Sequence, residues 1–370
     1  MRSPSRTAQN GFTLIELMVS MVLGLLTVLV ITQVTVQAEG RKRTVSMGND
    51  AQVNGSLSLF TLQKDIQMAG YGATASPDAL GCQVNRKYDT GGATAQFTLA
   101  PVMISNGALG APDTITILQA STHNISVPIL VKADHTQAGT YFVVDGAMGV
   151  STGDLMIAAP KTQTAGTQCT LFSVTNNSAS ADTTLSSTRI PHTTTSKWNQ
   201  SSIFPTAGYL LNDSYLLNMG QLILRTYAIN SSNNLTSTDV SPVDGSAATQ
   251  ELYPQIVNLQ AFYGKDTNAD GVIDTYDNTN PTTAAGWQQV LTIRLAIVAR
   301  SGQFERDVVT PTMPAWDVGA QVTVSGTTTS TCNGSSKCVE LKVDSLTDWQ
   351  HYRYKVYETV VPLRNVLWNS

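Results

Sequence analysis

One apolar stretch near the N-terminus limits most strongly what this chain can fold into. Between Phe12 and Val36 the only charged side chain is Glu16, and residues 1–11 ahead of it are polar with two arginines. A helix over this stretch would be about 37 Å long at ~1.5 Å per residue, enough to cross a bilayer. The stretch is also longer than the apolar core of an ordinary secretory signal. We therefore predict a membrane-spanning helix at 12–36.

Three processing states fit this segment. It could be a secretory signal cut after Ala38, an uncleaved anchor, or a leader cut between Gly11 and Phe12. Glu16 distinguishes the last two, because a carboxylate inside a membrane costs at least ~2.5 kcal/mol and needs a partner or a function. Cleavage after Gly11 would place a new α-amino group one helical turn from Glu16. In a filament, that amine could meet the glutamate of a neighbouring subunit.

The run Gly11-Phe12-Thr13-Leu14-Ile15-Glu16-Leu17 resembles the type IV prepilin motif. The resemblance implies that a prepilin peptidase cuts after Gly11, that Phe12 is then N-methylated, and that Glu16 guides docking into the filament. It also implies a cytoplasmic N-terminus, a single pass through the inner membrane and an exported C-terminal domain. These expectations divide the chain into a leader (1–11), the spanning half of the helix (12–36), an amphipathic half (37–71) and a globular domain (72–370).

The amphipathic half carries an apolar stripe. Leu59, Leu62, Ile66 and Ala69 follow helical spacing, which predicts packing on the globular domain. Gly40, Gly48 and Gly55 weaken the middle of the helix, so we expect a kink or local melting there, and Gly70 and Gly72 should end it.

After Gly72 the pattern changes to short apolar or alternating runs separated by Gly, Pro, Asn and Asp. Residues 290–300 alternate strictly, with Leu291, Ile293, Leu295 and Ile297 on one face. Residues 175–202 are rich in Ser, Thr and Asn and predict a long exposed loop. The fold class is therefore α+β, a long N-terminal helix before a large β-rich domain, with strands predicted at 96–104, 114–118, 127–131, 140–144, 154–158, 222–229, 256–263, 290–300, 321–324, 339–343 and 351–361.

Composition argues against one class of partner and favours disulfide bonds. The net charge is -4 and the pI about 5.5, which argues against nucleic acid. An even number of cysteines in an exported chain favours disulfides. Cys332 and Cys338 enclose a turn-rich loop that a bridge would close, leaving Cys82 to pair with Cys169; free buried thiols are the alternative.

Residues 266–277 have the spacing of a calcium loop. Oxygen-bearing side chains occupy positions 1, 3, 5, 9 and 12, and Gly271 at position 6 allows the sharp bend. Asp277 stands where a helix-loop-helix site has glutamate, and the flanks predict strands. The alternative is an acidic, solvated hairpin loop. We expect a free-standing Ca²⁺ site whose ligands are Asp266, Asn268, Asp270, the Val272 carbonyl, Asp274 and Asp277.

Four further runs resemble PilW-type minor pilins of type IV pili: Asp65–Tyr71, Tyr263–Asp266, Leu291–Arg300 and Val361–Asn365. The resemblance implies a non-enzymatic minor pilin that primes or caps the pilus and supports twitching motility. Its partners would be other minor pilins, the major pilin, the inner-membrane assembly platform and a pilus-tip adhesin. The alternatives are a J-type pseudopilin of type II secretion, or an exported enzyme or ligand-binding domain on a pilin-type anchor, for which the unmatched region 75–250 leaves room.

Overall fold

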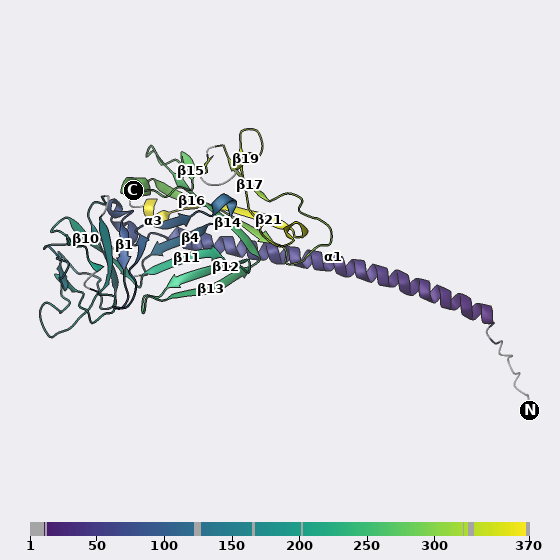
Figure 1. The fold of residues 1–370 in the computed structure, drawn as a ribbon, viewed down its shortest axis with the longest axis horizontal. Coiled ribbons are helices and arrows are strands. Elements are labelled where there is room, and N and C mark those ends of the chain that lie inside the picture. The colour runs from purple at the N-terminus through teal and green to yellow at the C-terminus, as the bar shows by residue number, and fades with distance from the viewer. Residues whose placement is uncertain are drawn as a thin grey trace, which may run out of the picture. The chain divides into compact units, whose positions relative to one another are not determined.

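The computed structural model describes residues 11, 13–121, 127–164, 167–200, 203–320, 322–324 and 329–367. It divides into two compact units, Met1–Asp50 and Ala51–Ser370. The first contains the N-terminal part of helix α1 (Leu14–Met68), and the second contains the last turns of α1 and the β-rich domain (Figure 1).

Helix α1 is continuous from Leu14 to Met68. The expected melting at Gly40, Gly48 and Gly55 is therefore wrong, because the ladder of helical hydrogen bonds outweighs the weak propensity of isolated glycines. The predicted end is confirmed: Gly70 and Gly72 both have φ of 81°, a left-handed conformation that favours glycine. The segment Leu14–Gly40 is long and apolar enough to cross a membrane.

Three larger sheets form the β-rich domain. The six-stranded sheet has the spatial order β2 (Ala95–Thr98), β1 (Gln83–Arg86), β8 (Gln168–Ser173), β7 (Leu155–Pro160), β10 (Ser214–Gly220) and β5 (Ile129–Leu130). One five-stranded sheet has the order β13 (Ala247–Pro254), β12 (Asn234–Val240), β11 (Ile223–Ile229), β4 (Thr114–Gln119) and β3 (Val102–Ser105). The other has the order β18 (Val322–Thr323), β15 (Thr275–Asp277), β14 (Ile256–Lys265), β16 (Val290–Arg300) and β21 (Tyr354–Pro362).

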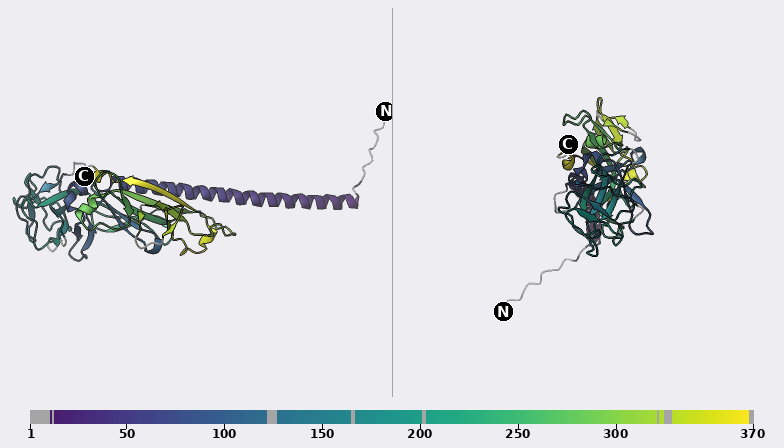
Figure 2. Two further views of the ribbon diagram at one scale, coloured as in Figure 1. Left: turned by 90° about the horizontal axis from the view of Figure 1, so that it is seen from above. Right: turned by 90° about the vertical axis from the view of Figure 1, so that its left-hand side faces the viewer.

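Smaller elements complete the domain. They are a sheet of β17 (Ala315–Gly319), β20 (Lys337–Glu340) and β19 (Thr329–Thr331), a pair of β6 (Tyr141–Val143) and β9 (Arg189–Pro191), and the short helices α2 (Ala284–Gln288) and α3 (Arg364–Leu367). Single 3₁₀ turns cover Ala73–Ala75, Pro77–Ala79, Ala108–Gly110 and Trp349–His351. Within the second unit, the teal strand β10 and the yellow strand β21 lie toward opposite ends (Figure 1), as the left view of Figure 2 also shows.

Two of the sheets are buried on both faces, so the domain has three cores. On β7, Leu155, Ile157 and Ala159 enter a central core, while Met156 and Ala158 enter a second core, which we call the distal core. On β16, the odd-numbered residues 291–299 enter the central core, as predicted, whereas Ala296 and Val298 enter a third, C-terminal core with Trp316. Each buried strand thus serves two layers by simple alternation.

The end of α1 packs on the central core. Leu62, Ile66 and Ala69 are fully buried there, as their spacing predicted. A Cβ at Gly55 would collide with the ring of Tyr357 on β21, so this glycine allows close approach of helix and sheet.

The α+β fold class is confirmed, and most predicted strands are present. The long exposed loop at 175–202 is wrong in part: it contains strand β9, and Ile190, His192 and Trp198 are buried. Polar side chains dominate that segment and hid its few core residues. Both predicted disulfides are present, Cys82–Cys169 joining adjacent strands β1 and β8, and Cys332–Cys338 closing the loop between β19 and β20.

Candidate functional sites: the ends of α1 and an acidic loop

The N-terminal end of α1 holds the predicted processing residues. Gly11 precedes the helix and is exposed, and Phe12 lies outside the described residues. The Thr13 hydroxyl accepts a hydrogen bond from the backbone N–H of Glu16 at 3.3 Å, which is a helix cap. Glu16 lies in the first turn and is exposed, where the helix dipole favours its negative charge.

The C-terminal end of α1 is held by charges from the sheet. Arg225 on β11 donates from Nη1 to Asp65 on α1 at 2.6 Å and from Nε to Asp239 on β12 at 2.6 Å. The Tyr227 hydroxyl donates to the same Asp65 oxygen at 2.7 Å. Burial, and then the Asp65 carboxylate, raise the pKa of Tyr227, so its phenol stays protonated and donates.

The C-terminus of the chain closes the same helix end. Asn365 on α3 donates from Nδ2 to the carbonyls of Met68 and Ala69 at 3.1 and 3.0 Å. These carbonyls belong to the last turn, where the helix itself supplies no donors. The Thr74 hydroxyl in turn donates to the Asn365 carbonyl at 3.0 Å. We call Asp65, Arg225, Tyr227, Asp239 and Asn365 the helix clamp.

The sequence runs that resembled minor pilins are therefore largely architectural. Asp65 and Asn365 belong to two of them and meet at one helix end although 300 positions separate them in the chain. Tyr263 belongs to a third, and its hydroxyl accepts from the backbone N–H of Ile104 at 2.7 Å inside the central core. Arg225 was missed, because a single arginine in a half-exposed strand carries no local signal for a partner 160 positions away.

The acidic loop at 266–277 is compact. Asp266 is 5% exposed and accepts backbone N–H bonds from Asp270 at 3.2 Å and Gly271 at 2.7 Å. Asn268 Nδ2 lies 3.2 Å from Asp270 Oδ2 and 3.4 Å from Asp274 Oδ1. Gly271 has φ of 85°, as the predicted bend requires. These hydrogen bonds link Asp266, Asn268, Asp270 and Asp274 within one loop.

Asp277, the last predicted ligand, is bound to another side chain. Asp277 lies on β15, where Oδ1 accepts from Lys265 Nζ at 2.7 Å and from the Thr279 backbone at 2.8 Å, and both side chains are mostly buried. Hydrogen bonds from the Thr267 hydroxyl and backbone lower the pKa of Asp274, so it is ionised at neutral pH. Within the described ranges, no group of three or more His, Cys, Asp or Glu side chains is close enough to hold a metal ion.

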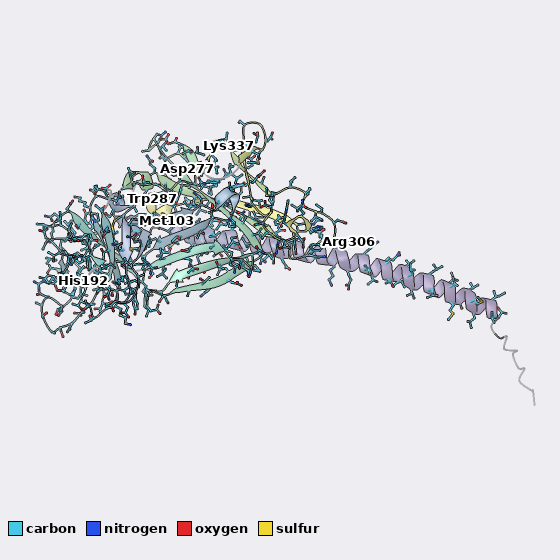
Figure 3. All side chains as sticks on the ribbon, in the orientation of Figure 1. Met103, His192, Asp277, Trp287, Arg306 and Lys337 are labelled. Atoms are coloured by element: carbon cyan, nitrogen blue, oxygen red, sulfur yellow. A yellow bond between two sulfur atoms is a disulfide. The ribbon has the colours of Figure 1, made fainter. Side chains whose placement is uncertain are left out.

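The distal core contains a histidine pair that the sequence did not predict. His135 and His192 face each other with their Nε2 atoms 2.8 Å apart, among Phe142, Phe172 and Phe204. Burial lowers the pKa of His135 to about 4. Burial, and then the nearby His135, lower the pKa of His192 to about 3. His192 is labelled in Figure 3. Both are therefore neutral at pH 7.

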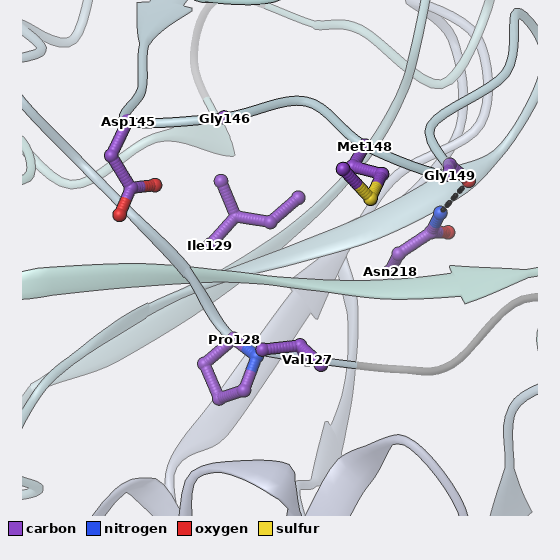
Figure 4. Close-up of a pocket in the computed structure, with 8 residues that line it drawn as sticks. All are labelled: Val127, Pro128, Ile129, Asp145, Gly146, Met148, Gly149 and Asn218. Carbon is purple, nitrogen blue, oxygen red and sulfur yellow. Dashed lines mark hydrogen bonds between the residues drawn. The ribbon is translucent and has the colours of Figure 1, made fainter.

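A pocket of about 600 Å³ opens beside β5 and β10 (Figure 4). Its walls are mainly apolar, and its polar side chains are Asp145 and Asn218, the latter donating to the Gly149 carbonyl at 3.2 Å. Gly149–Gly153 also has the G-x-S-x-G spacing of hydrolase nucleophiles, which the sequence reasoning overlooked. That motif needs a strand-to-helix turn, whereas here it connects β6 to β7 with Ser151 exposed. The turn therefore lacks the strand-to-helix geometry of the α/β-hydrolase nucleophile.

Two family models match this chain, one near its N-terminus and one over its C-terminal part. Residues 225–365 match the family model of the type IV pilus-assembly protein W, and residues 6–32 match the prokaryotic N-terminal methylation motif. No curated protein and no solved structure matched the chain. The first match covers β11 to α3, including Arg225, the acidic loop and Asn365, and the second covers Gly11 to Glu16.

Proposed function

We propose that this chain, a PilW-like minor pilin of type IV pilus assembly, primes or caps the pilus filament together with other minor pilins. One observation carries the proposal: a methylation motif stands on the same helix whose far end is held by the family-matched sheet. The helix brings the chain to the filament, and the clamp fixes the globular domain to it. The role is structural and not enzymatic.

In this proposal the chain enters the inner membrane through Leu14–Gly40, and its β-rich domain is exported. Prepilin peptidase cuts between Gly11 and Phe12, and the new amine is methylated. Glu16 then meets the N-terminal amine of a neighbouring subunit, which neutralises a carboxylate that is costly in lipid. The partners are other minor pilins, the major pilin, the assembly platform and a tip adhesin.

Deletion of the gene tests the proposal. We expect loss of surface pili and of twitching, while secretion of extracellular enzymes continues. Normal piliation with lost secretion would instead place the chain in type II secretion. Intact-mass measurement of the mature protein should show an N-terminus at methylated Phe12; retention of Met1, or cleavage after Ala38, would remove the basis for filament docking.

We further propose that the acidic loop binds Ca²⁺ through the side chains of Asp266, Asn268, Asp270 and Asp274 and the Val272 carbonyl. Support comes from the calcium-loop spacing of these residues and from the bend at Gly271, whose φ is 85°. Asp277 would join as the sixth ligand only by exchanging Lys265 for the ion. Extracellular sites of this type bind at about 0.1–1 mM.

Isothermal titration of the full chain in detergent tests the loop. We expect heat of binding at millimolar calcium, its loss in Asp270→Asn, and no change in Asp307→Asn, which removes one exposed carboxylate elsewhere. Asp277→Asn separates the two coordination schemes, since it weakens binding only if Asp277 is a ligand. Absence of heat in the unmodified chain would exclude the site.

A further inference from the structure

The disulfide-closed loop between β19 and β20 contains an asparagine followed directly by a glycine, Asn333–Gly334. Within the described residues the same dipeptide also occurs at 54–55 on α1 and at 106–107 after β3. In such a dipeptide the asparagine side chain can cyclise onto the next backbone nitrogen, because glycine has no side chain to shield that atom. The three pairs offer the same reacting atoms, so the fold around each pair decides which of them reacts.

Both reacting groups at Asn333 are free. Asn333 and Gly334 are exposed, and a Cβ added to Gly334 would meet no other atom within 4 Å. Among the described residues, neither the Asn333 side-chain amide nor the Gly334 N–H makes a hydrogen bond. The turn is closed through other groups, since the Ser336 N–H donates to the Asn333 carbonyl at 3.0 Å. The side chain and the attacking nitrogen can therefore approach each other without breaking a contact.

The pair on α1 is held in place. Asn54 donates from Nδ2 to the Pro254 carbonyl at 3.3 Å. Gly55 is buried within α1, where its N–H is part of the helical hydrogen-bond ladder. Cyclisation at this position would break both hydrogen bonds and interrupt the helix.

The pair after β3 is held by two hydrogen bonds as well. Asn106 donates from Nδ2 to the Asn278 carbonyl at 2.6 Å. The Gly107 N–H donates to Asp113 Oδ1 at 2.8 Å. Each of the two reacting groups is thus engaged with a different part of the chain, and this pair is a matched control for Asn333.

We propose that Asn333 is a self-modification site, at which the side-chain amide is lost and the exposed loop gains a carboxylate. The Gly334 nitrogen attacks Cγ of Asn333, so a C–N bond forms while the Cγ–Nδ2 bond breaks. The released NH₂ group takes up the proton of the attacking nitrogen and leaves as ammonia. The inference goes beyond the proposed function and does not depend on it.

Water completes the reaction by opening the cyclic imide. Addition of water at Cγ gives aspartate at position 333. Addition at the main-chain carbonyl gives isoaspartate, whose backbone runs through Cβ and Cγ. Neither step changes an oxidation state, and water is the only co-reactant.

The product changes the charge and the backbone of the loop. Its carboxylate joins that of Asp317, which accepts a hydrogen bond from the Ser336 hydroxyl. Lys337, labelled in Figure 3, donates from Nζ to the Val322 carbonyl at 2.6 Å and so already has a partner. In isoaspartate the former main-chain carbonyl becomes the free carboxylate, so the turn that the Ser336 N–H closes has to rearrange.

Peptide mass spectrometry of the full chain in detergent tests the proposal. The folded protein, with its disulfides intact, is incubated at neutral pH in H₂¹⁸O, so that conversion during the incubation carries the heavy isotope and conversion during digestion does not. We expect Asn333 to convert about tenfold or more faster than Asn54 and Asn106, because reaction at either control first breaks two hydrogen bonds. A rate at Asn333 equal to or below that at Asn106 would overturn the proposal.

The reduced chain in denaturant shows whether the fold is responsible. There the three pairs are equally accessible and should convert at similar rates. If Asn333 keeps its full advantage in the denatured chain, the neighbouring sequence and not the fold determines the rate, and the structural argument is wrong.

A variant and the product chemistry test the cyclic route. Asn333→Gln keeps the amide but lengthens the side chain, so the favourable ring can no longer form. We expect this peptide to keep its amide while Asn54 and Asn106 behave as before. In the unmodified chain isoaspartate should accompany aspartate at position 333, and the rate should rise with pH because the attacking nitrogen has to lose its proton. Equal conversion of the glutamine variant, or aspartate as the sole product, would exclude the imide.

Discussion

The six-stranded sheet and the sheet of β14, β16 and β21 are both covered on two faces, but by different kinds of contact. Each is buried on both faces, with the central core on one side and a smaller core on the other. The β14–β16–β21 sheet lies within the family-matched residues, and polar clamp residues from this region hold α1. The six-stranded sheet lies outside the match, and its outer face is covered by long connections with aromatic rings and two neutral histidines.

Both halves use apolar burial and each contains a disulfide, but they differ in their other contacts. The matched half uses ion pairs and side-chain hydrogen bonds to fix a helix in one register. The unmatched half has the disulfide between residues that are far apart in sequence and the buried histidine pair. Loss of a disulfide, loss of a charge and a fall in pH should therefore affect the halves unequally.

The largest effect should follow loss of the bridge in the unmatched half. Replacing Cys82 and Cys169 by serine frees a loop of 87 residues and should lower the free energy of unfolding by about 4–5 kcal/mol. The matched control replaces Cys332 and Cys338, 6 positions apart, and should cost about 2 kcal/mol. Denaturant unfolding of the three proteins measures both; equal losses would remove the distinction between the halves.

Breaking the helix clamp should rank second. Arg225→Met leaves the carboxylates of Asp65 and Asp239 without their cation and should cost about 3 kcal/mol, the low end of the loss for a buried pair, because two carboxylates lose their partner at once. Hydrogen exchange should increase most in residues 51–68. Arg306→Met, at an exposed position, serves as the control. Unchanged exchange in α1 would show that apolar packing alone holds the helix.

A fall in pH should have the third-largest effect, because it changes the stability of the two halves in opposite directions. The folded pKa values of His135 and His192, about 4 and about 3, lie below the ordinary 6.5, so the unfolded chain takes up protons first as pH falls. Unfolding of the distal core should become easier by about 2 kcal/mol per histidine between pH 7.5 and 5. Burial raises the pKa of Asp113, beside β14, to about 7. Asp113 therefore takes up a proton more readily in the folded than in the unfolded chain, and acidification over the same interval raises the free energy of unfolding around β14.

Hydrogen exchange by segment at the two pH values measures this contrast. Protection of the strands around His135 should fall at pH 5 while protection of β14 is kept. In a double variant with His135→Phe and His192→Phe, the loss in the distal core should disappear. A uniform fall across both halves would contradict the assignment of the acid response to the histidine pair.

The smallest effect should come from the C-terminal cap. Asn365→Ala removes two hydrogen bonds to the last carbonyls of α1 and should cost about 1–2 kcal/mol. Asn365→Asp keeps the size but loses the donors, and it adds a negative charge at the negative end of the helix dipole. We expect it to be worse than alanine in thermal unfolding; an aspartate variant as stable as the unmodified chain would exclude the capping role.

Much of the framework was predictable, because it is encoded locally. The membrane segment, the stripe through Leu62 and Ile66, and the alternation on β16 all follow from short-range periodicity. Strand β12 was missed because Asn234–Val240 is polar and acquires its structure from its neighbours β11 and β13. The histidine pair and the link from Asp65 to Arg225 join residues 57 and 160 positions apart, and no local pattern encodes such distances.

Asn365 has a consequence for the order of events during export. If the residues after the membrane segment are exported in chain order, Asp65 and the last carbonyls of α1 cross early, and Asn365, the donor that satisfies those carbonyls, crosses about 300 positions later. Strand β21, which packs on Gly55, also arrives late. The last carbonyls of the helix therefore lack this donor until Asn365 is outside. A chain that stopped short of Asn365 would carry the membrane segment without the closed helix end.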